Sequence, residues 1–507
     1  MAWALALAWP ALAAATAPQA WSLADWDAAW WTPPGSGAPR PGRVVLAYAG
    51  APARPVAIFP GSDQEPGILV SRPLPLKPGS IYELSFELLR PQFVNGHYLS
   101  VALAGREFLL DQHCIAGGWQ SFRMRAAYAA GAPPLAVFRN DTPSRFMLRN
   151  PELRAVAAAA PPDGRDAPPA PLLRPFPLGV YETEHADWPR VQACGFNLVT
   201  AGLPLDGLAA ALAEAAGLGL RVIPVLPAEP GKLRAWPQAL AGLDPGLRPP
   251  FFYLVDEPEL RSFDPALLGR LRAELRAGLP WARLATAMVR PGLTADYAAA
   301  YDAIFMDQYP VPGQPLNWLA DSVGEARAAL PAGCQVWAVV QAFALPKLGW
   351  PRLPTAEEMQ ALAGSALAAG AQGLLFYTWP QIATDPAHHA HVSALLARIK
   401  ALEPWLPLAP GPGTGLGAGL TGRALRTPSG GDAVRVGHGL HQGRRLLLAV
   451  NQTPYPATLR LQGLGPAPLR LAELWSGGEK AAIAGELRET IEPFGVRAWA
   501  WPTAARP

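Results

Sequence analysis

Between residues 175 and 406 the sequence alternates short apolar runs with longer stretches rich in Ala and Leu, and this alternation strongly constrains the fold. Continuous apolar runs are typical of parallel strands that are buried on both faces. The runs are Leu178–Glu182, Asn197–Gly202, Arg221–Leu226, Phe251–Asp256, Leu284–Val289, Ala303–Gln308, Gln335–Gln341 and Gly373–Trp379. Helical patterns follow them, for example at Leu205–Leu218, Pro265–Leu279, Thr355–Gly370 and Pro386–Leu402. Eight strand–helix units in about 230 residues predict an α/β fold, a (β/α)8 TIM barrel.

A doubly wound open sheet is the alternative, but it rarely gives eight units, and no glycine-rich phosphate loop follows the first run to support it.

The residues on either side of the barrel have the shorter period of antiparallel strands. Residues 21–156 contain several runs with period-two alternation, which predict an N-terminal β-sandwich. These runs are Ile81–Leu88, Tyr98–Ala104, Trp119–Arg125, Leu135–Phe138 and Phe146–Leu148. Residues 157–174 are rich in Pro and Ala and predict a linker, across which few contacts are expected. Strands return over residues 407–507 and predict a C-terminal β-sandwich, with runs at Arg444–Asn451, Ala457–Leu461, Leu469–Trp475 and Val496–Trp501.

The first 20 residues indicate export. Met1–Ala17 is almost purely apolar, and Ala11-Leu12-Ala13 has the small-x-small pattern of a signal-peptide cleavage site. We therefore expect a secreted or periplasmic protein. The leader has no Lys or Arg, so an uncleaved N-terminal anchor is the alternative. No other stretch approaches the ~18 apolar residues that a membrane span needs.

Composition argues against several partner classes. The net charge of +3 without a long basic run does not fit a nucleic-acid partner. Cys114, Cys194 and Cys334 show no Cys/His spacing for zinc. The spacing of His388, His389 and His391 fits a solvated helix start better than a metal site. No metal or cofactor is therefore expected, and the oligomeric state stays open.

Polar and aromatic residues end several of the predicted barrel strands. The carboxyl ends of barrel strands meet at one mouth, where barrel enzymes keep their catalytic groups. The residues expected there are Tyr181, Glu182, Asp256, Glu257, Asp307, Tyr309, Gln341, Tyr377 and Trp379. Carboxylates to break a bond, amides for hydroxyl groups and flat rings for stacking predict a carbohydrate site. Asp256, Glu257 and Asp307 are the expected catalytic residues, and the others are expected to bind substrate.

The barrel resembles glycoside hydrolases of clan A. In that clan strand four ends in Asn-Glu-Pro with the Glu as acid/base, strand six offers a Tyr, strand seven the nucleophilic Glu and strand eight a Trp. Glu257, Tyr309 and Trp379 match this pattern, whereas Asp256 replaces the Asn and Gln341 replaces the nucleophile. The resemblance implies a glycoside hydrolase acting on a poly- or oligosaccharide. An amide cannot attack an anomeric carbon, so the ordinary retaining mechanism is not expected.

Three interpretations remain open. The Asp256-Glu257 pair resembles that of N-acetylhexosaminidases that use the substrate's acetamido oxygen as nucleophile, in which the Asp orients the acetamide and the Glu protonates the leaving oxygen. An inverting enzyme would use Glu257 as acid and Asp307 as base for a water, with the two carboxyl groups ~6.5–9.5 Å apart. A catalytically silent sugar-binding protein on a glycosidase barrel is the third, and Gln341 favours it.

The N-terminal segment has a resemblance of its own. The strings "LPLKPGSIYELSFELL", "GGWQSFRMR" and "FMLRNPEL" resemble jelly-roll carbohydrate-binding modules of bacterial glycosidases. This resemblance implies either sugar binding or bracing of the neighbouring domain.

Overall fold

The computed structural model describes residues 74–89, 99–104, 106–110, 119–132, 134–140, 146–156, 172–229, 231–261, 263–411, 433–464 and 468–502. It also gives the backbone of six further strands, which are β1 (Gln19–Ala20), β2 (Trp26–Asp27), β3 (Val45–Ala49), β4 (Arg54–Phe59), β5 (Gly67–Ser71) and β21 (Gly417–Gly422). Most of the predicted signal peptide, most of the linker and Cys114 lie outside the described residues.

The N-terminal β domain, defined here as strands β1 to β11, consists of two antiparallel sheets with the strand orders β3-β4-β11-β6-β9 and β2-β5-β10-β7-β8; β1 pairs with β11. Its other strands are β6 (Ile81–Leu89), β7 (Leu99–Leu103), β8 (Arg106–Leu109), β9 (Gln120–Ala127), β10 (Ala136–Asn140) and β11 (Phe146–Val156). Alternate residues of β6 and β9 are buried, as the period-two pattern predicts. Phe86 from the first sheet meets Phe138 from the second at 4.8 Å between ring centroids. The two sheets therefore share one core.

The central domain is a closed barrel of eight parallel strands, so this prediction is confirmed. The strands are β12 (Leu178–Val180), β13 (Leu198–Ala201), β14 (Arg221–Leu226), β15 (Phe252–Leu254), β16 (Leu284–Met288), β17 (Ala303–Met306), β18 (Gln335–Gln341) and β19 (Leu374–Tyr377). The barrel interior is filled by residues that include Phe251, Tyr253, Phe305 and Trp337. The barrel is therefore a packed core, and ligands have access only at its ends.

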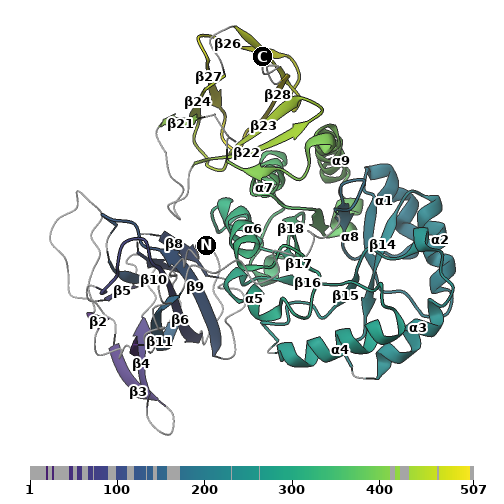
Figure 1. Cartoon of the computed structure of the whole chain (residues 1–507), viewed down its shortest axis with the longest axis horizontal. Helices are drawn as coiled ribbons and strands as arrows, with labels where there is room; N and C mark the ends of the chain where they lie inside the picture. The colour runs from purple at the N-terminus through teal and green to yellow at the C-terminus, as the bar shows by residue number, and fades with distance from the viewer. Residues whose placement is uncertain are drawn as a thin grey trace, which may run out of the picture.

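Helices of very different lengths follow the strands (Figure 1). They are α1 (Trp188–Cys194), α2 (Leu208–Gly217), α3 (Trp236–Ala239), α4 (Pro265–Gly278), α5 (Thr294–Tyr297), α6 (Asn317–Ala329), α7 (Ala356–Ala368), α8 (Trp379–Thr384) and α9 (Pro386–Ala401). Strong sequence signals start some of them. At α7 a capping box joins the Thr355 hydroxyl to the Glu358 N–H and the Glu358 carboxylate to the Thr355 N–H. None of the described helices is long and apolar enough to cross a membrane.

The C-terminal region has one sheet in the order β20-β22-β23-β28-β25-β26 and a second in the order β21-β24-β27. Its strands besides β21 are β20 (Ala409–Pro410), β22 (Val434–His441), β23 (Arg444–Asn451), β24 (Ala457–Gln462), β25 (Leu469–Glu473), β26 (Glu479–Ala482), β27 (Glu486–Ile491) and β28 (Val496–Pro502). It packs on α7 (Figure 1). A Cβ at Gly437 would lie 2.6 Å from the Cα of Ala368, so only glycine allows β22 to come this close.

The N-terminal β domain packs against the barrel beside α5 and α6 (Figure 1). Arg123 of β9 donates to both carboxylate oxygens of Asp296 at 2.9 Å. Arg290 likewise donates to the Gln120 side chain and the Ser121 carbonyl of β9, and Arg106 pairs with Glu325, so several groups cross between the two parts. The expectation of few contacts across the linker is therefore wrong, because a linker's composition says nothing about the surfaces that it joins.

Candidate active site

The end of strand four is a strained turn that carries two carboxylates. After β15 the backbone enters the left-handed region at Val255 (φ 57°) and again at Glu257 (φ 46°). A β-branched residue rarely adopts this conformation, and each such residue costs about 1–3 kcal/mol. The fifth strand of the barrel, β16, which is called strand five below, holds this turn. The Thr286 hydroxyl donates to the Val255 carbonyl at 2.6 Å, and the Glu257 N–H donates to the Ala287 carbonyl at 3.2 Å. This geometry directs the side chains of residues 256 and 257 to the mouth of the barrel.

A cleft of about 470 Å³ opens at this mouth. The acids that line it are Glu182, Asp256, Glu257 and Asp307, and the aromatic residues are Tyr181, Tyr253, Tyr309, Phe343, Trp350 and Tyr377. None of the described residues that line the cleft is Lys, Arg or His. A cleft with acidic and aromatic walls suits a neutral, hydroxyl-rich ligand better than an anion.

Asp307, directly after β17, forms a carboxyl pair with Glu257. Its side chain is hydrogen-bonded to that of Glu257, and the residue is only 5% exposed. Burial raises the pKa of Asp307 well above its usual range, and the nearby carboxylates of Glu257, Asp256 and Glu259 raise it further. The two carboxyl groups therefore favour sharing a proton over being ionised together.

Asp256 has a different environment. Its side chain is 48% exposed, and the Tyr253 hydroxyl donates to Oδ1 at 2.5 Å. Arg261 Nη2 lies 3.2 Å from Oδ2. The Asp256 carboxylate is thus held from two sides at the edge of the cleft, where a ligand donor can reach it.

The opposite side of the cleft is built on strands one and eight. Glu182 accepts hydrogen bonds from the Tyr377 hydroxyl at 2.9 Å and from the Thr378 hydroxyl at 2.6 Å. Tyr309 stacks with Tyr377 at 5.9 Å between ring centroids. Trp350 closes the wall and donates from Nε1 to the Tyr309 carbonyl at 2.9 Å. These contacts fix a carboxylate and three rings where they can bind hydroxyl groups and sugar faces.

The structure thus brings seven of the nine predicted site residues to the cleft, and two expectations are wrong. Gln341 is 0% exposed, and its amide makes two 2.9 Å hydrogen bonds with the backbone of Val311. It ties down the loop after strand six and does not line the cleft. Trp379 is 1% exposed and packs on Phe196, because strand eight ends at Tyr377 and Trp379 begins α8.

His388 also differs from expectation. It is buried, and its Nε2 lies 3.0 Å from the Ala342 carbonyl, so it is not a solvated helix start. Within the described part of the chain, no group of three or more His, Cys, Asp or Glu side chains is arranged to hold a metal ion.

Two residues near the cleft were not predicted from the sequence. Trp350 lies in the loop after strand seven, and an aromatic residue in a loop at the barrel mouth was a usable signal. Glu259 is buried behind Glu257, and its Oε1 accepts the N–H groups of Val289 at 2.7 Å and Arg290 at 3.1 Å. Burial raises the pKa of Glu259 to about 7. Its only signal was a third acid within four residues.

No protein-family model matches the sequence, and no curated protein matches it. Similar solved structures include a GH27 β-L-arabinopyranosidase from Geobacillus stearothermophilus, with a TM-score of 0.46, 9% identity, and coverage of 65% of this chain and 97% of that chain. An α-amylase from Geobacillus thermoleovorans complexed with acarbose has a TM-score of 0.43 and 10% identity, covering 65% of this chain and 99% of that one. A GH30 endoxylanase from Clostridium papyrosolvens has a TM-score of 0.40 and 12% identity, covering 66% and 98% respectively.

Proposed function

We propose that this protein is a glycoside hydrolase that cleaves a poly- or oligosaccharide in the cleft at the barrel mouth. The observation that carries the proposal is the Glu257–Asp307 carboxyl pair, which holds a proton beside Asp256 in an aromatic-walled cleft. Cleavage of a glycosidic bond needs an acid that is still protonated at the working pH to protonate the leaving oxygen. In this proposal Glu257 is that acid: it shares the proton of the pair, and its side chain is less buried than that of Asp307 and so can reach a ligand in the cleft.

The choice of mechanism rests on the spacing of the carboxyl groups. An inverting pair stands ~6.5–9.5 Å apart so that a water fits between the sugar and the base. The hydrogen bond between Glu257 and Asp307 leaves no such gap. It therefore favours participation of the substrate's own acetamido group over a water activated by Asp307, and the proposed substrate is an N-acetylhexosaminide.

Hydrolysis then takes two steps. Glu257 gives its proton to the glycosidic oxygen while the acetamido oxygen bonds to the anomeric carbon, and the bond to the leaving group breaks. Asp256 accepts the acetamido N–H and stabilises the positive charge that develops on this group. Water then attacks the anomeric carbon and gives a proton to Glu257, while the bond between this carbon and the acetamido oxygen breaks. The acetamide is thereby restored, and the configuration is retained. Asp307, the more buried member of the pair, shares its proton with Glu257 between turnovers.

The first test is Glu257→Gln, assayed on aryl glycosides with poor leaving groups, N-acetylated and plain. General acid catalysis is worth about 10²–10⁴-fold, so kcat should fall by that factor. Glu184→Gln is the matched control, because Glu184 is an exposed acid near the same rim that does not line the cleft. Unchanged rates in Glu257→Gln would remove Glu257 from the role of acid.

The second test separates the two mechanisms. Participation predicts no activity on the plain hexoside, retained configuration in the first product by NMR, and nearly equal damage from Asp256→Ala and Glu257→Gln. An inverted first product would exclude participation and return Asp307 to the role of base. If the wild-type protein binds oligosaccharides but hydrolyses none, the silent sugar-binding alternative is correct. Gln341 no longer favours that alternative, since its side chain does not face the cleft.

Two further proposals rest on sequence alone. Export follows from the apolar leader in residues 1–20, and sugar binding by the N-terminal β domain follows from its resemblance to jelly-roll modules. Retention of the purified protein on insoluble polysaccharides tests the second, and N-terminal sequencing of protein recovered from the culture medium or periplasm tests the first.

A further inference from the structure

The end of strand five contacts both members of the carboxyl pair through its backbone. The Ala287 carbonyl accepts the Glu257 N–H at 3.2 Å, and the Met288 carbonyl accepts the Asp307 N–H at 3.4 Å. One residue further, the Val289 carbonyl accepts Gln308 Nε2 at 2.5 Å. Residues 287–289 therefore lie between strands four and six and set how far apart Glu257 and Asp307 are held.

The same segment is tied to the acidic turn from its other side. Glu259 Oε1 accepts the N–H groups of Val289 and Arg290, and both partners are buried. Hydrogen bonds to a buried carboxyl group are hard to replace, because no water is at hand to satisfy the groups that lose them. A movement of residue 290 is thus passed to the turn that carries Glu257.

The side chain of Arg290 leaves the barrel and ends in the N-terminal β domain. Only 5% of the residue is exposed. Its Nη1 donates to Gln120 Oε1 at 3.1 Å and to the Ser121 carbonyl at 3.2 Å, both in β9. Its guanidinium carbon lies 4.4 Å from the centroid of the Phe122 ring. Arg290 is therefore an anchor whose two ends belong to different domains.

The contact around this anchor is close. A Cβ at Gly292 would lie 1.8 Å from the Arg123 carbonyl oxygen, so the backbones of the two domains touch here. The Arg123–Asp296 ion pair follows within one turn. The N-terminal β domain is thus packed directly against the segment that follows strand five.

We propose that Arg290 is a positioning residue that fixes the spacing of Glu257 and Asp307 by anchoring the end of strand five in the N-terminal β domain. The N-terminal β domain is then a part of the catalytic unit. The effect of Arg290 on catalysis rests on the proposed hydrolase function, whereas its effect on the spacing of Glu257 and Asp307 can be measured without any activity.

The ionisation of Asp307 reports the spacing. Asp307 is faced by the carboxyl groups of Glu257, Asp256 and Glu259, and by the hydroxyl groups of Tyr181, Tyr253 and Tyr309. Because like charges at short range raise a carboxyl pKa, loosening the pair lowers the pKa of Asp307. A variant that merely destabilises the fold does not move this value in the native state.

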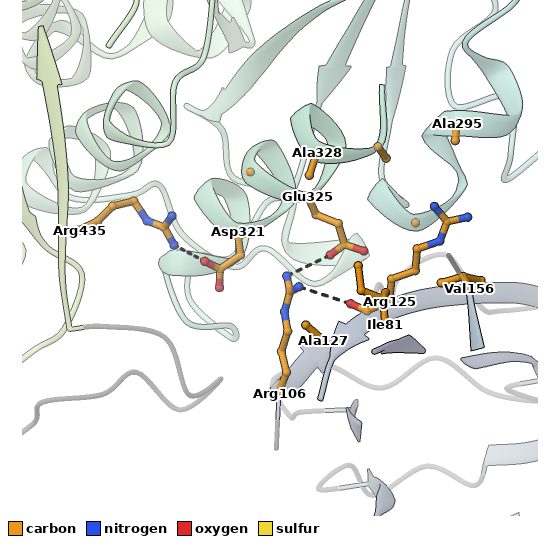
Figure 2. Close-up of a pocket in the computed structure, with 13 residues that line it drawn as sticks. Ile81, Arg106, Arg125, Ala127, Val156, Ala295, Asp321, Glu325, Ala328 and Arg435 are labelled. Carbon is orange, nitrogen blue, oxygen red and sulfur yellow. Dashed lines mark hydrogen bonds and ion pairs between the residues drawn. The ribbon is translucent and has the colours of Figure 1, made fainter. Parts of the chain in front are cut away.

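The experiment compares Arg290→Met with Arg106→Met in the full-length chain. Figure 2 shows Arg106 at the same domain interface, in a cleft of about 390 Å³, where its guanidinium lies 3.6 Å from Glu325. Both variants remove one arginine from the interface. Of the two arginines, Arg290 belongs to the segment at the end of strand five, whereas Arg106 belongs to β8. The readouts are the titration of Asp307 by NMR with ¹³C-labelled carboxyl groups, and kcat and KM on the glycoside that the wild type hydrolyses.

Arg290→Met should lower the pKa of Asp307 by about one pH unit or more. It should also lower kcat by about 10–100-fold with KM within about threefold, since small displacements of catalytic groups act on the chemical step. Arg106→Met should match the wild type in both. An unchanged Asp307 titration in folded Arg290→Met overturns the inference, even if the wild type is an active hydrolase. If the wild type hydrolyses nothing while the titration shifts as expected, the hydrolase proposal fails and the positioning role stands.

If Arg290→Met does not fold, Gln120→Met replaces it. This change removes one acceptor of Arg290 from the surface of β9 and keeps the Ser121 carbonyl. The Asp307 titration should then shift in the same direction by a smaller amount, about half a pH unit. No shift in this variant overturns the inference.

Discussion

Gln341→Glu installs a carboxyl group where strand seven of clan A barrels offers a nucleophile, and we expect it to cost stability without adding activity. The Gln341 amide accepts from the Val311 N–H and donates to the Val311 carbonyl, both at 2.9 Å, with no solvent exposure. A carboxylate keeps the first contact but turns an oxygen toward the Val311 carbonyl. Only the protonated acid can donate there, so the pKa of the introduced group must rise.

The cost follows from linkage. A carboxyl group whose pKa rises from about 4.3 to about 7 on folding destabilises the native state by about 3–4 kcal/mol at pH 7. Because the pKa of this group is higher in the native state, the native state binds more protons than the unfolded state. The free energy of unfolding therefore falls as pH rises from about 4 to about 7. For a domain of this size, the barrel transition should fall by about 6–16 °C at pH 7 and by much less at pH 4.

Scanning calorimetry of the barrel transition between pH 4 and pH 8 measures how the loss of stability in Gln341→Glu depends on pH, with Gln341→Met as the control. Methionine has a similar shape, loses both hydrogen bonds and cannot titrate, so its loss of about 2–4 kcal/mol should not depend on pH. A pH-independent loss in Gln341→Glu, or new hydrolysis of a plain glycoside with retention, would show that residue 341 reaches the cleft and would refute the reasoning.

Three other outcomes are expected. Trp350→Ala should raise KM by about tenfold with kcat less changed, because a stacking surface worth about 1–2 kcal/mol is lost from the cleft wall; an unchanged KM would place the sugar elsewhere. Burial raises the pKa of Glu358, but hydrogen bonds from Arg352 and Thr355 lower it below its usual value, so Glu358→Gln should cost about 1–2 kcal/mol near pH 7 and less as pH falls below about 4. Residues 44–156, which contain the predicted strands of the N-terminal β-sandwich, should melt cooperatively when expressed alone, and an aggregated product would contradict folding independent of the barrel.

The barrel was predictable because buried parallel strands leave an unambiguous apolar signature. The predicted runs Arg221–Leu226 and Gln335–Gln341 coincide with β14 and β18. The predicted strands were too long where residues of the candidate site directly follow the apolar run. Phe251–Asp256 contains only the three strand residues of β15, because Val255 turns left-handed. A hydrophobic pattern cannot reveal a conformation that is stabilised by hydrogen bonds from the neighbouring strand.

The errors at the site have a common physical cause. Chain position along strand seven puts Gln341 at the mouth, but the loop at Val311 covers it, and the path of a loop is not encoded in strand periodicity. Glu259 and Arg290 act through partners that are distant in sequence, up to 170 residues for Gln120. Local patterns predicted which residue types gather at the mouth, whereas tertiary contacts decide which of them reach the ligand.

The contacts of strand five also explain why the N-terminal β domain packs where it does. The strained turn at Val255 and Glu257 must be held by its neighbour, and strand five holds it through Thr286 and Ala287. The helix after strand five, α5, has only 4 residues, whereas α4 and α6 on either side have 14 and 13. A one-turn helix covers little of the strand in front of it. β9 of the N-terminal domain packs on this same segment, so the docked domain supplies the bracing that a full helix gives to the neighbouring units.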